Sequence, residues 1–357
     1  MNINLQKQDA LCDAIRNGDF RQVTLLLAQG AAVNEPDHNG FLPLSVAFDR
    51  RHIELARFML DRGATLHSAN QLLKSACGSD WREGILLALE HHADVNSVAP
   101  NGTPVYFAIA RQCGHENIRL LLNKGLNSLL ADEEGTTILH LLAEHARDDL
   151  IPLFLSNGAD VNAKRYEDEE TPLHYATRAI GSNCVVPTRH TVAILLTNGA
   201  WIESRAKWGQ TPLHYAASSG NGACAAELIQ AGARIDSTDD RRCTPLYIAA
   251  RFGRVEIIQM LLEAGADPNA YKTFPLISSI HHGITIATML LENGTEIDRQ
   301  SAEGKTAIMC AASLGYADVV RLLVNRGANL ALRSNEGYTA LDYARNNGFD
   351  SIAATLL

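Results

Sequence analysis

The chain has 357 residues, more than the roughly 250 to 300 that a single hydrophobic core usually supports. Either several domains or one long repeat array is therefore expected. With 46% apolar residues, 20% charged residues and 11 prolines, the composition is that of a globular chain, which excludes disordered and collagen-like classes. The net charge of −9, without a basic stripe, argues against nucleic-acid binding and favours protein partners.

The lack of recognisable targeting signals and the pattern of cysteines predict a reducing compartment. The longest apolar runs, 105–110 and 307–312, are far shorter than the roughly 20 residues of a membrane span. The N-terminal residues resemble neither a secretory signal nor a transit peptide, so the cytosol or the nucleus is expected. The seven cysteines are odd in number and form no CxxC pair, which predicts reduced, mostly buried thiols.

One motif recurs along the whole chain: Leu-Leu, a polar pair, a glycine with a small residue, and an Asn/Asp turn. The glycine, or the residue in its place, falls at Gly30, Gly63, His92, Gly125, Gly158, Gly199, Gly232, Gly265, Gly294 and Gly327. Six of the nine steps between these positions are 33 residues, and the others are 29, 41 and 29. A second marker keeps step with the first, most clearly as Thr-Pro-Leu-His at 171–174 and 211–214.

Each marker has a physical reason. Threonine before a helix accepts a hydrogen bond from a free amide, and proline at the first helical position loses no needed donor. A first helix of about eight residues is expected after each Thr-Pro, ending at a left-handed glycine such as Gly220. Apolar residues at helical spacing over 255–262 predict a second helix that ends at Gly265. The turns that follow predict an outward hairpin finger.

This unit of a turn and two helices, with Thr-Pro-Leu-His, resembles the ankyrin repeat family over essentially the whole chain. The resemblance implies an all-α repeat solenoid, one curved stack with a concave groove. We predict one solenoid over residues 1–357, expected to be a monomer. Its eleven repeats are expected at about 1–36, 37–69, 70–98, 99–131, 132–164, 165–205, 206–238, 239–271, 272–300, 301–333 and 334–357.

Several repeats depart from the pattern. Repeat 1 starts with polar residues 6–9, as an N-terminal cap would. Repeat 3 is four residues short and carries His92 in place of the glycine, so a stunted finger is expected, and repeat 9 is short as well. Repeat 6 carries an insertion at about 180–190, either a tolerated surface loop or a specificity loop. The last repeat stops before its final turn, which suggests a fragment or an end that packs on something.

The partner-facing surface of ankyrin proteins is usually the concave side, made of finger tips and first-helix ends. Aromatic residues and arginines gather there in repeats 6 to 9, and these residue types dominate interface energetics. The alternative is that each packs on the neighbouring finger. The candidate partner-binding residues are Tyr166, Arg178, Lys207, Trp208, Arg241, Arg242, Arg251, Phe252, Tyr271, His281 and His282.

Histidines raise the question of a metal site. His140, His174 and His214 belong to the Thr-Pro-Leu-His marker, where the resemblance implies a structural bond between repeats. The adjacent pairs 91–92 and 281–282 are expected to point about 100° apart on a helix, which disfavours a shared metal. We therefore predict no metal ligands and no cofactor.

Two further motifs invite a chemical interpretation. Residues 220–225 match a dinucleotide fingerprint as text, but they lie in a turn between two helices, so the match is false. The acidic run 167–170 is expected to be a solvated charge cluster at a helix start, or else a docking patch for a basic peptide. No catalytic motif is found.

The sequence thus predicts a non-catalytic scaffold or adaptor that binds a protein or peptide in its concave groove. Tyr166, Trp208, Arg251 and Phe252 are the expected anchors, and the basic residues of fingers 7 and 8 are expected to guide an acidic segment. Two alternatives stay open. The chain is the repeat portion of a larger adaptor or effector, or it carries a small-molecule or catalytic function grafted on the stack.

Overall fold

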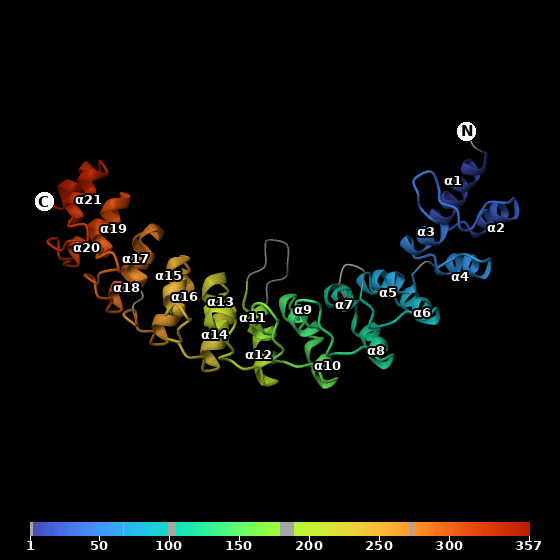
Figure 1. Ribbon diagram of the computed structural model, residues 1–357, viewed down its shortest axis with the longest axis horizontal. Helices are drawn as coiled ribbons and strands as arrows, with labels where there is room; N and C mark the ends of the chain where they lie inside the picture. The colour runs from blue at the N-terminus through green and yellow to red at the C-terminus, as the bar shows by residue number, and fades with distance from the viewer. Residues whose placement is uncertain (1–2, 67, 99–104, 179–188, 272–273) are drawn as a thin grey trace. The chain divides into compact units, whose positions relative to one another are not determined.

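The computed structural model describes all residues except 1–2, 67, 99–104, 179–188 and 272–273, and every regular element among the described residues is a helix (Figure 1). The chain divides into two compact units, Met1–Glu133 and Glu134–Leu357. The division falls in the finger that opens repeat 5. The all-α repeat architecture is confirmed, whereas the single uninterrupted stack and the eleven repeat boundaries remain predictions.

The N-terminal unit holds four pairs of helices. They are α1 (Ile3–Arg16), α2 (Phe20–Ala28), α3 (Pro43–Asp49), α4 (Ile53–Asp61), α5 (Ala69–Gly78), α6 (Arg82–Glu90), α7 (Tyr106–Gln112) and α8 (His115–Asn123). Within each pair the helices are joined by a short turn, and α1 also packs on α3 and α5 on α7. Leu11, Ile15, Met59 and Ile85 are fully buried between them.

The short third repeat lacks a finger. Only residues 62–68 connect α4 to α5, and Ser68 caps α5 by accepting a hydrogen bond from the Gln71 amide at 3.1 Å. His92, which replaces the usual glycine after α6, adopts a left-handed backbone with φ of 62°. The prediction of a stunted finger is therefore confirmed for the segment that leads into repeat 3.

The C-terminal unit continues the paired arrangement. It holds α9 (Ile138–Glu144), α10 (Ile151–Ser156), α11 (Pro172–Tyr175), α12 (Arg189–Thr197), η1 (Lys207–Gly209), α13 (Pro212–Ser219), α14 (Gly222–Gln230), α15 (Pro245–Arg251), α16 (Val255–Glu263), α17 (Pro275–Ser278), η2 (Ile280–His282), α18 (Ile284–Glu292), α19 (Ala307–Leu314), α20 (Ala317–Asn325), α21 (Ala340–Asn346) and α22 (Asp350–Thr355). First helices pack on first helices, as α13 does on α15, and second helices on second helices, as α14 does on α16.

Small residues explain the close packing of the first helices. Ala216 and Ala217 in α13, and Ala249 and Ala250 in α15, are completely buried, so the two helices approach without large side chains between them. Gly220 ends α13 with φ of 85°, a conformation that side chains disfavour. Residues 220–222 therefore form the turn between two helices, as predicted, and not a nucleotide-binding loop.

Threonine and histidine together start the first helices and join the repeats. In repeat 7 the Thr211 amide donates to Nδ1 of His214 at 3.1 Å, and Nε2 of His214 lies 3.0 Å from the Cys243 carbonyl oxygen of repeat 8. Because Nδ1 accepts a hydrogen bond, the proton is on Nε2, and the ring is neutral. The expected structural role of this histidine is confirmed.

The same bridge occurs twice more in this unit. Nε2 of His140 lies 3.1 Å from the Glu170 carbonyl oxygen, and Nε2 of His174 lies 3.1 Å from that of Gln210. Burial lowers the pKa of each of these two imidazoles to about 4, since desolvation outweighs the favourable bond to the carbonyl. Burial also lowers the pKa of His214.

Candidate functional site

The fingers of repeats 5 to 8 are joined tip to tip. The Tyr166 amide donates to the Glu134 carbonyl at 2.9 Å, the Lys207 amide to the Asp168 carbonyl at 2.6 Å, and the Asp240 amide to the Trp208 carbonyl at 2.9 Å. Successive tips are therefore held at fixed positions by backbone bonds. This ladder places Tyr166, Lys207, Trp208 and Arg241 on neighbouring fingers.

Four fingers hold a non-glycine residue in the left-handed region, where most side chains are strained. They are Glu169, Trp208, Arg242 and Tyr271, with φ of 53°, 66°, 64° and 54°. The other fingers described have glycine in that conformation, at Gly40, Gly135, Gly304 and Gly337. The strained residues thus belong to repeats 6, 7 and 8, which are among the repeats singled out from the sequence.

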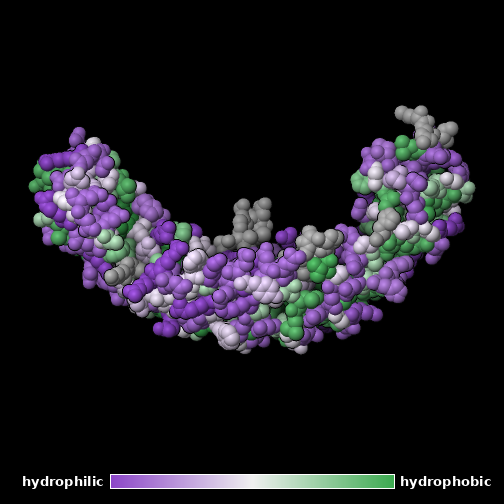
Figure 2. Space-filling view, in the orientation of Figure 1, coloured by the Kyte–Doolittle hydropathy of each residue, from purple (hydrophilic) through white to green (hydrophobic). Residues whose placement is uncertain are grey.

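Large aromatic side chains are exposed on the same repeats. Tyr166 is 71% exposed, Trp208 and Tyr271 are each 54% exposed, and Phe252 at the end of α15 is 48% exposed. Cations accompany them: Nζ of Lys207 lies 5.9 Å and Cζ of Arg241 5.4 Å from the Trp208 ring. These aromatic groups therefore lie among charges, and hydrophilic residues dominate the visible surface over α13 to α16 (Figure 2).

The two residues at the end of α15, Arg251 and Phe252, also combine a basic with an aromatic side chain. Cζ of Arg251 lies 5.8 Å from the Phe252 ring, and the Arg251 carbonyl oxygen lies 2.9 Å from Nε2 of His282 in the next repeat. His281 and His282 do not diverge by 100° as expected for an α-helix. They lie in the 3-10 helix η2 with ring centroids 3.9 Å apart, and desolvation, then the nearby His282, lowers the pKa of His281.

Arg178 differs from the other candidate residues because it is held inside the stack. Its Nη2 donates to Glu144 at 2.6 Å, its Nη1 to Glu170 at 3.0 Å, and its guanidinium lies 3.5 Å from the centre of the Tyr175 ring. Tyr215 donates a further hydrogen bond to Glu170 at 2.7 Å. This network joins repeats 5, 6 and 7, so Arg178 is a positioning residue of the fold and not an exposed contact.

The same network corrects the interpretation of the acidic run 167–170. Glu170 is 8% exposed, and burial raises the pKa of its carboxyl group despite the bonds from Tyr215 and Arg178. Asp168 pairs with Arg165 at 2.5 Å and Glu169 with Lys164 at 2.7 Å. Glu167 and Glu169 are exposed, as expected of a solvated cluster, whereas Glu170 and the half-buried Asp168 are committed to internal pairs.

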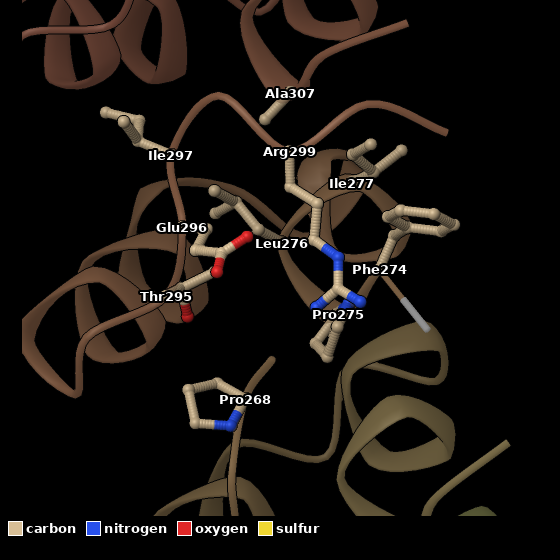
Figure 3. Close-up of a pocket in the computed structure, with 10 residues that line it drawn as sticks. All are labelled: Pro268, Phe274, Pro275, Leu276, Ile277, Thr295, Glu296, Ile297, Arg299 and Ala307. Atoms are coloured by element: carbon tan, nitrogen blue, oxygen red, sulfur yellow. The ribbon is translucent and has the colours of Figure 1, made fainter. Parts of the chain in front are cut away.

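The short finger of repeat 9 is completed by an arginine from the next finger. Arg299 donates to the carbonyl oxygens of Asn269, at 2.5 Å, and of Tyr271, and its guanidinium lies 5.4 Å from the Phe274 ring. Figure 3 shows its side chain reaching toward Phe274 and Pro275. The hollow beside it has room for only about 10 Å³, close to one water, so it is a packing gap and not a ligand pocket of several hundred Å³.

Sequence reasoning missed Arg299, Glu144 and Tyr215. Tyr215 carries a weak signal, since it follows Thr-Pro-Leu-His just as Tyr175 does. Most of the insertion of repeat 6 lies outside the described residues, and so does Lys272. Helix α12 begins after the insertion, at Arg189. Of the cysteines in the described part, four are buried and Cys243 and Cys310 are half-buried.

Among the described residues, each helix falls short of the length and apolarity that a membrane span needs. Paired helices with an outward turn, a Thr-Pro start and a histidine bridge define a helical repeat protein. The family model described as ankyrin repeats in three copies matches residues 73–165, 186–272 and 276–357. The chain belongs to the ankyrin repeat family.

Relatives share this fold in otherwise different proteins. A homolog of transient receptor potential cation channel subfamily A member 1 from Caenorhabditis elegans is 29% identical over 64% of this chain and 16% of its own length. Ankyrin repeat and SOCS box protein 16 from Mus musculus is 29% identical over 65% of this chain and 52% of its own. The chain thus spans at most about half of these relatives.

A solved structure supports the assignment. The ankyrin repeat domain of Bcl-3, titled a unique member of the IkappaB protein family, aligns with a TM-score of 0.52 and 26% identity. The alignment covers 62% of this chain and all of that domain. Ankyrin repeats in general are protein-interaction modules, with extended surfaces suited to large partners.

Proposed function

We propose that the chain is a non-catalytic scaffold or adaptor, and that a protein or peptide partner binds the finger tips and first-helix ends of repeats 6 to 9. Tyr166, Trp208, Arg251 and Phe252 are the anchors in this proposal. They belong to the residue types that bury much area on binding while keeping a polar group. Tyr271, His281 and His282 extend the surface into repeat 9.

The backbone strain at the finger tips is the observation that carries this proposal. A left-handed backbone costs a side-chain-bearing residue about 1 kcal/mol or more. Glycine, present at the place of Arg242 in neighbouring repeats, as Gly209 is in repeat 7, avoids that cost. Folding alone therefore gives no reason for Arg242, nor for a second left-handed residue, Trp208, just before Gly209, and strained residues collect at sites that bind ligands. Among the finger tips described, the strained residues occur where exposed aromatic and basic residues gather.

The proposal is tested by comparing the proteins captured from cells of the source organism by the wild type and by the triple variant Trp208→Ala, Arg251→Ala, Phe252→Ala. Mass spectrometry identifies the captured proteins, and circular dichroism verifies the fold. We expect one or more partners to be lost, since each removed anchor contributes on the order of 1 to 2 kcal/mol.

A matched triple variant provides the control. Trp201, Arg234 and Val255 are exposed residues of repeats 6, 7 and 8 that lie outside the finger tips, and their joint replacement by alanine should leave the captured set unchanged. If the tip variant keeps every partner, or if the control loses the same ones, the contact surface lies elsewhere.

Replacing Arg242 by glycine should make the protein more stable but a poorer binder. Glycine adopts φ of 64° without strain, so the free energy of unfolding is expected to rise by up to about 1 kcal/mol. The lost guanidinium should weaken partner capture. Urea unfolding and quantitative capture measure the two effects.

The reverse substitution is available in repeat 11. Gly337 has φ of 85° and open space around it, so Gly337→Arg should lower the free energy of unfolding by about 1 kcal/mol and leave capture unchanged. If Arg242→Gly captures the partner as well as the wild type does, the strain in finger 8 is unrelated to binding.

A further inference from the structure

Four cations of repeats 7 and 8 have no carboxylate partner. Lys207, Arg241, Arg242 and Arg251 are exposed, and none of them forms an ion pair with a carboxylate in the described part of the chain. Other basic groups of this unit do pair, as Arg165 does with Asp168 and Lys305 with Glu303. In a chain with a net charge of −9, carboxylates are abundant, yet these four cations, which lie on two neighbouring repeats, pair with none of them in the described part.

The acidic residues just before Arg241 in the sequence form no ion pair with these cations in the described part. Asp239 is buried and accepts hydrogen bonds from the amides of Arg241, at 2.9 Å, and Cys243, at 2.7 Å. Asp240 is exposed, and its amide is the donor that ties finger 8 to Trp208. The positive charge of Arg241 and Arg242 is thus not cancelled by an ion pair.

The four cations and Trp208 lie on two neighbouring repeats, and we name them the basic ridge (Lys207, Trp208, Arg241, Arg242 and Arg251). Lys207 and Arg241 both lie within 6 Å of the Trp208 ring. Arg251 and Arg241 both act on the half-buried Cys243, where their charges oppose the rise that burial causes in the pKa of its thiol. The ridge therefore runs from finger 7 across finger 8 to the end of α15.

We propose that the basic ridge binds an extended acidic peptide segment of the partner, with carboxylates on the cations and an adjoining stretch of chain against Trp208. This inference rests on the proposed function and adds the chemistry of its partner. Unpaired guanidinium and ammonium groups attract carboxylates. Trp208 offers an apolar face that its left-handed backbone, with φ of 66°, holds at the tip.

The repeat spacing sets the spacing of the acidic residues. Neighbouring repeats are roughly 10 Å apart, as for packed helices, and an extended chain rises about 3.3 Å per residue. About three residues therefore separate the carboxylates that meet finger 7 and finger 8. A segment with Glu or Asp at every third position is the expected ligand.

The test uses the three tryptophans as reporters. The full chain is labelled with 5-fluorotryptophan, and fluorine NMR follows Trp81, Trp201 and Trp208 separately. Trp81 is buried, whereas Trp201 is 63% exposed in repeat 6, next to the repeat that carries Trp208. The probe is a 12-residue peptide of four Glu-Gly-Ser units. Its comparisons are the Gln-Gly-Ser peptide, and an isomer in which the four glutamates are adjacent.

We expect the Glu-Gly-Ser peptide to shift the Trp208 signal and to leave those of Trp81 and Trp201 in place. The Gln-Gly-Ser peptide should have no effect, and the clustered isomer should bind more weakly. Arg241→Glu should reduce the affinity about tenfold, and Arg234→Glu, the matched control in the preceding repeat, by less than about twofold.

Three results would overturn the inference. The first is no shift of Trp208 at about 5 mM peptide, beyond the range of even weak millimolar binding. The second is equal binding of the clustered isomer, which removes the argument from spacing. The third is tighter binding of an oligouridylate of the same charge, which would make the ridge a nucleic-acid site. If the peptide fails but the tip variant still loses its partner, only the ligand chemistry is wrong. If both fail, the surface itself is wrong.

Discussion

Replacement of Arg178 by methionine is expected to lower the free energy of unfolding by about 3 kcal/mol. The guanidinium of Arg178 bonds to Glu144 and Glu170 and covers the ring of Tyr175. The two carboxylates have side-chain exposures of only 15% and 11%. Without the arginine, the two carboxylates stay poorly solvated and have no positive partner. This uncompensated negative charge is the main cost in stability. Urea unfolding by circular dichroism measures it, and hydrogen exchange in α9, α11 and α13 locates it.

Two variants make this prediction specific. Glu170→Gln added to Arg178→Met removes one of the uncompensated charges, so the double variant should be more stable than Arg178→Met alone. Arg189→Met removes an arginine that pairs with Glu227 but is 57% exposed, and its loss should change stability by less than about 1 kcal/mol. A loss for Arg178→Met no larger than that for Arg189→Met would show that the network contributes little.

Mild acid is expected to destabilise the protein through its buried histidines. The pKa of His140 and His174 is about 4 in the folded chain, against about 6.5 when unfolded. Between these values the unfolded chain binds a proton at each histidine and the folded chain does not. The stability is therefore fully present above about pH 6.5 and falls as the pH drops toward 4. At pH 5 each histidine should account for about 2 kcal/mol.

Urea unfolding at pH 7.5, 6.5, 5.5 and 5.0 tests this dependence. His174→Asn keeps a short acceptor for the Thr171 amide but removes the titrating ring. This variant should be less stable at pH 7.5, because it loses the bond to the Gln210 carbonyl, and it should have a shallower slope with pH. A wild-type stability that stays flat from pH 7.5 to 5.0 would contradict the assignment of these rings as neutral.

Local rules made much of the fold predictable. Thr211 and Pro212 start α13 where capping chemistry requires it, and Gly220 ends it with a left-handed backbone. The stunted finger of repeat 3 and the bridging role of His214 followed from the repeat length and from the family resemblance. Each of these features depends on residues within one repeat or at a fixed offset between repeats.

The features that could not be predicted depend on side chains that meet across repeats without a fixed separation in the sequence. Arg178 reaches Glu144 from 34 residues away, and Tyr215 reaches Glu170 from 45. Arg299 replaces part of a finger that is too short, which a repeat pattern cannot encode. The strain at Arg242 had a visible signal, since it occupies the glycine position of the finger. The strain at Trp208 had none, because Gly209 follows it.

Because the fingers are joined by backbone bonds, the side chains at their tips can change in evolution independently of the helical core. The bonds from Tyr166, Lys207 and Asp240 use only amides and carbonyls, so the side chains at the tips can be exchanged without altering how one repeat follows the next. Several tip positions, such as Gly337, face open space. Others are crowded, since a side chain at Gly209 or Gly304 would meet Asp240 or Asn335 of the next finger. A new tip residue is therefore tolerated best at the open positions. Recognition can diversify one finger at a time while the helical core stays under its own, separate selection.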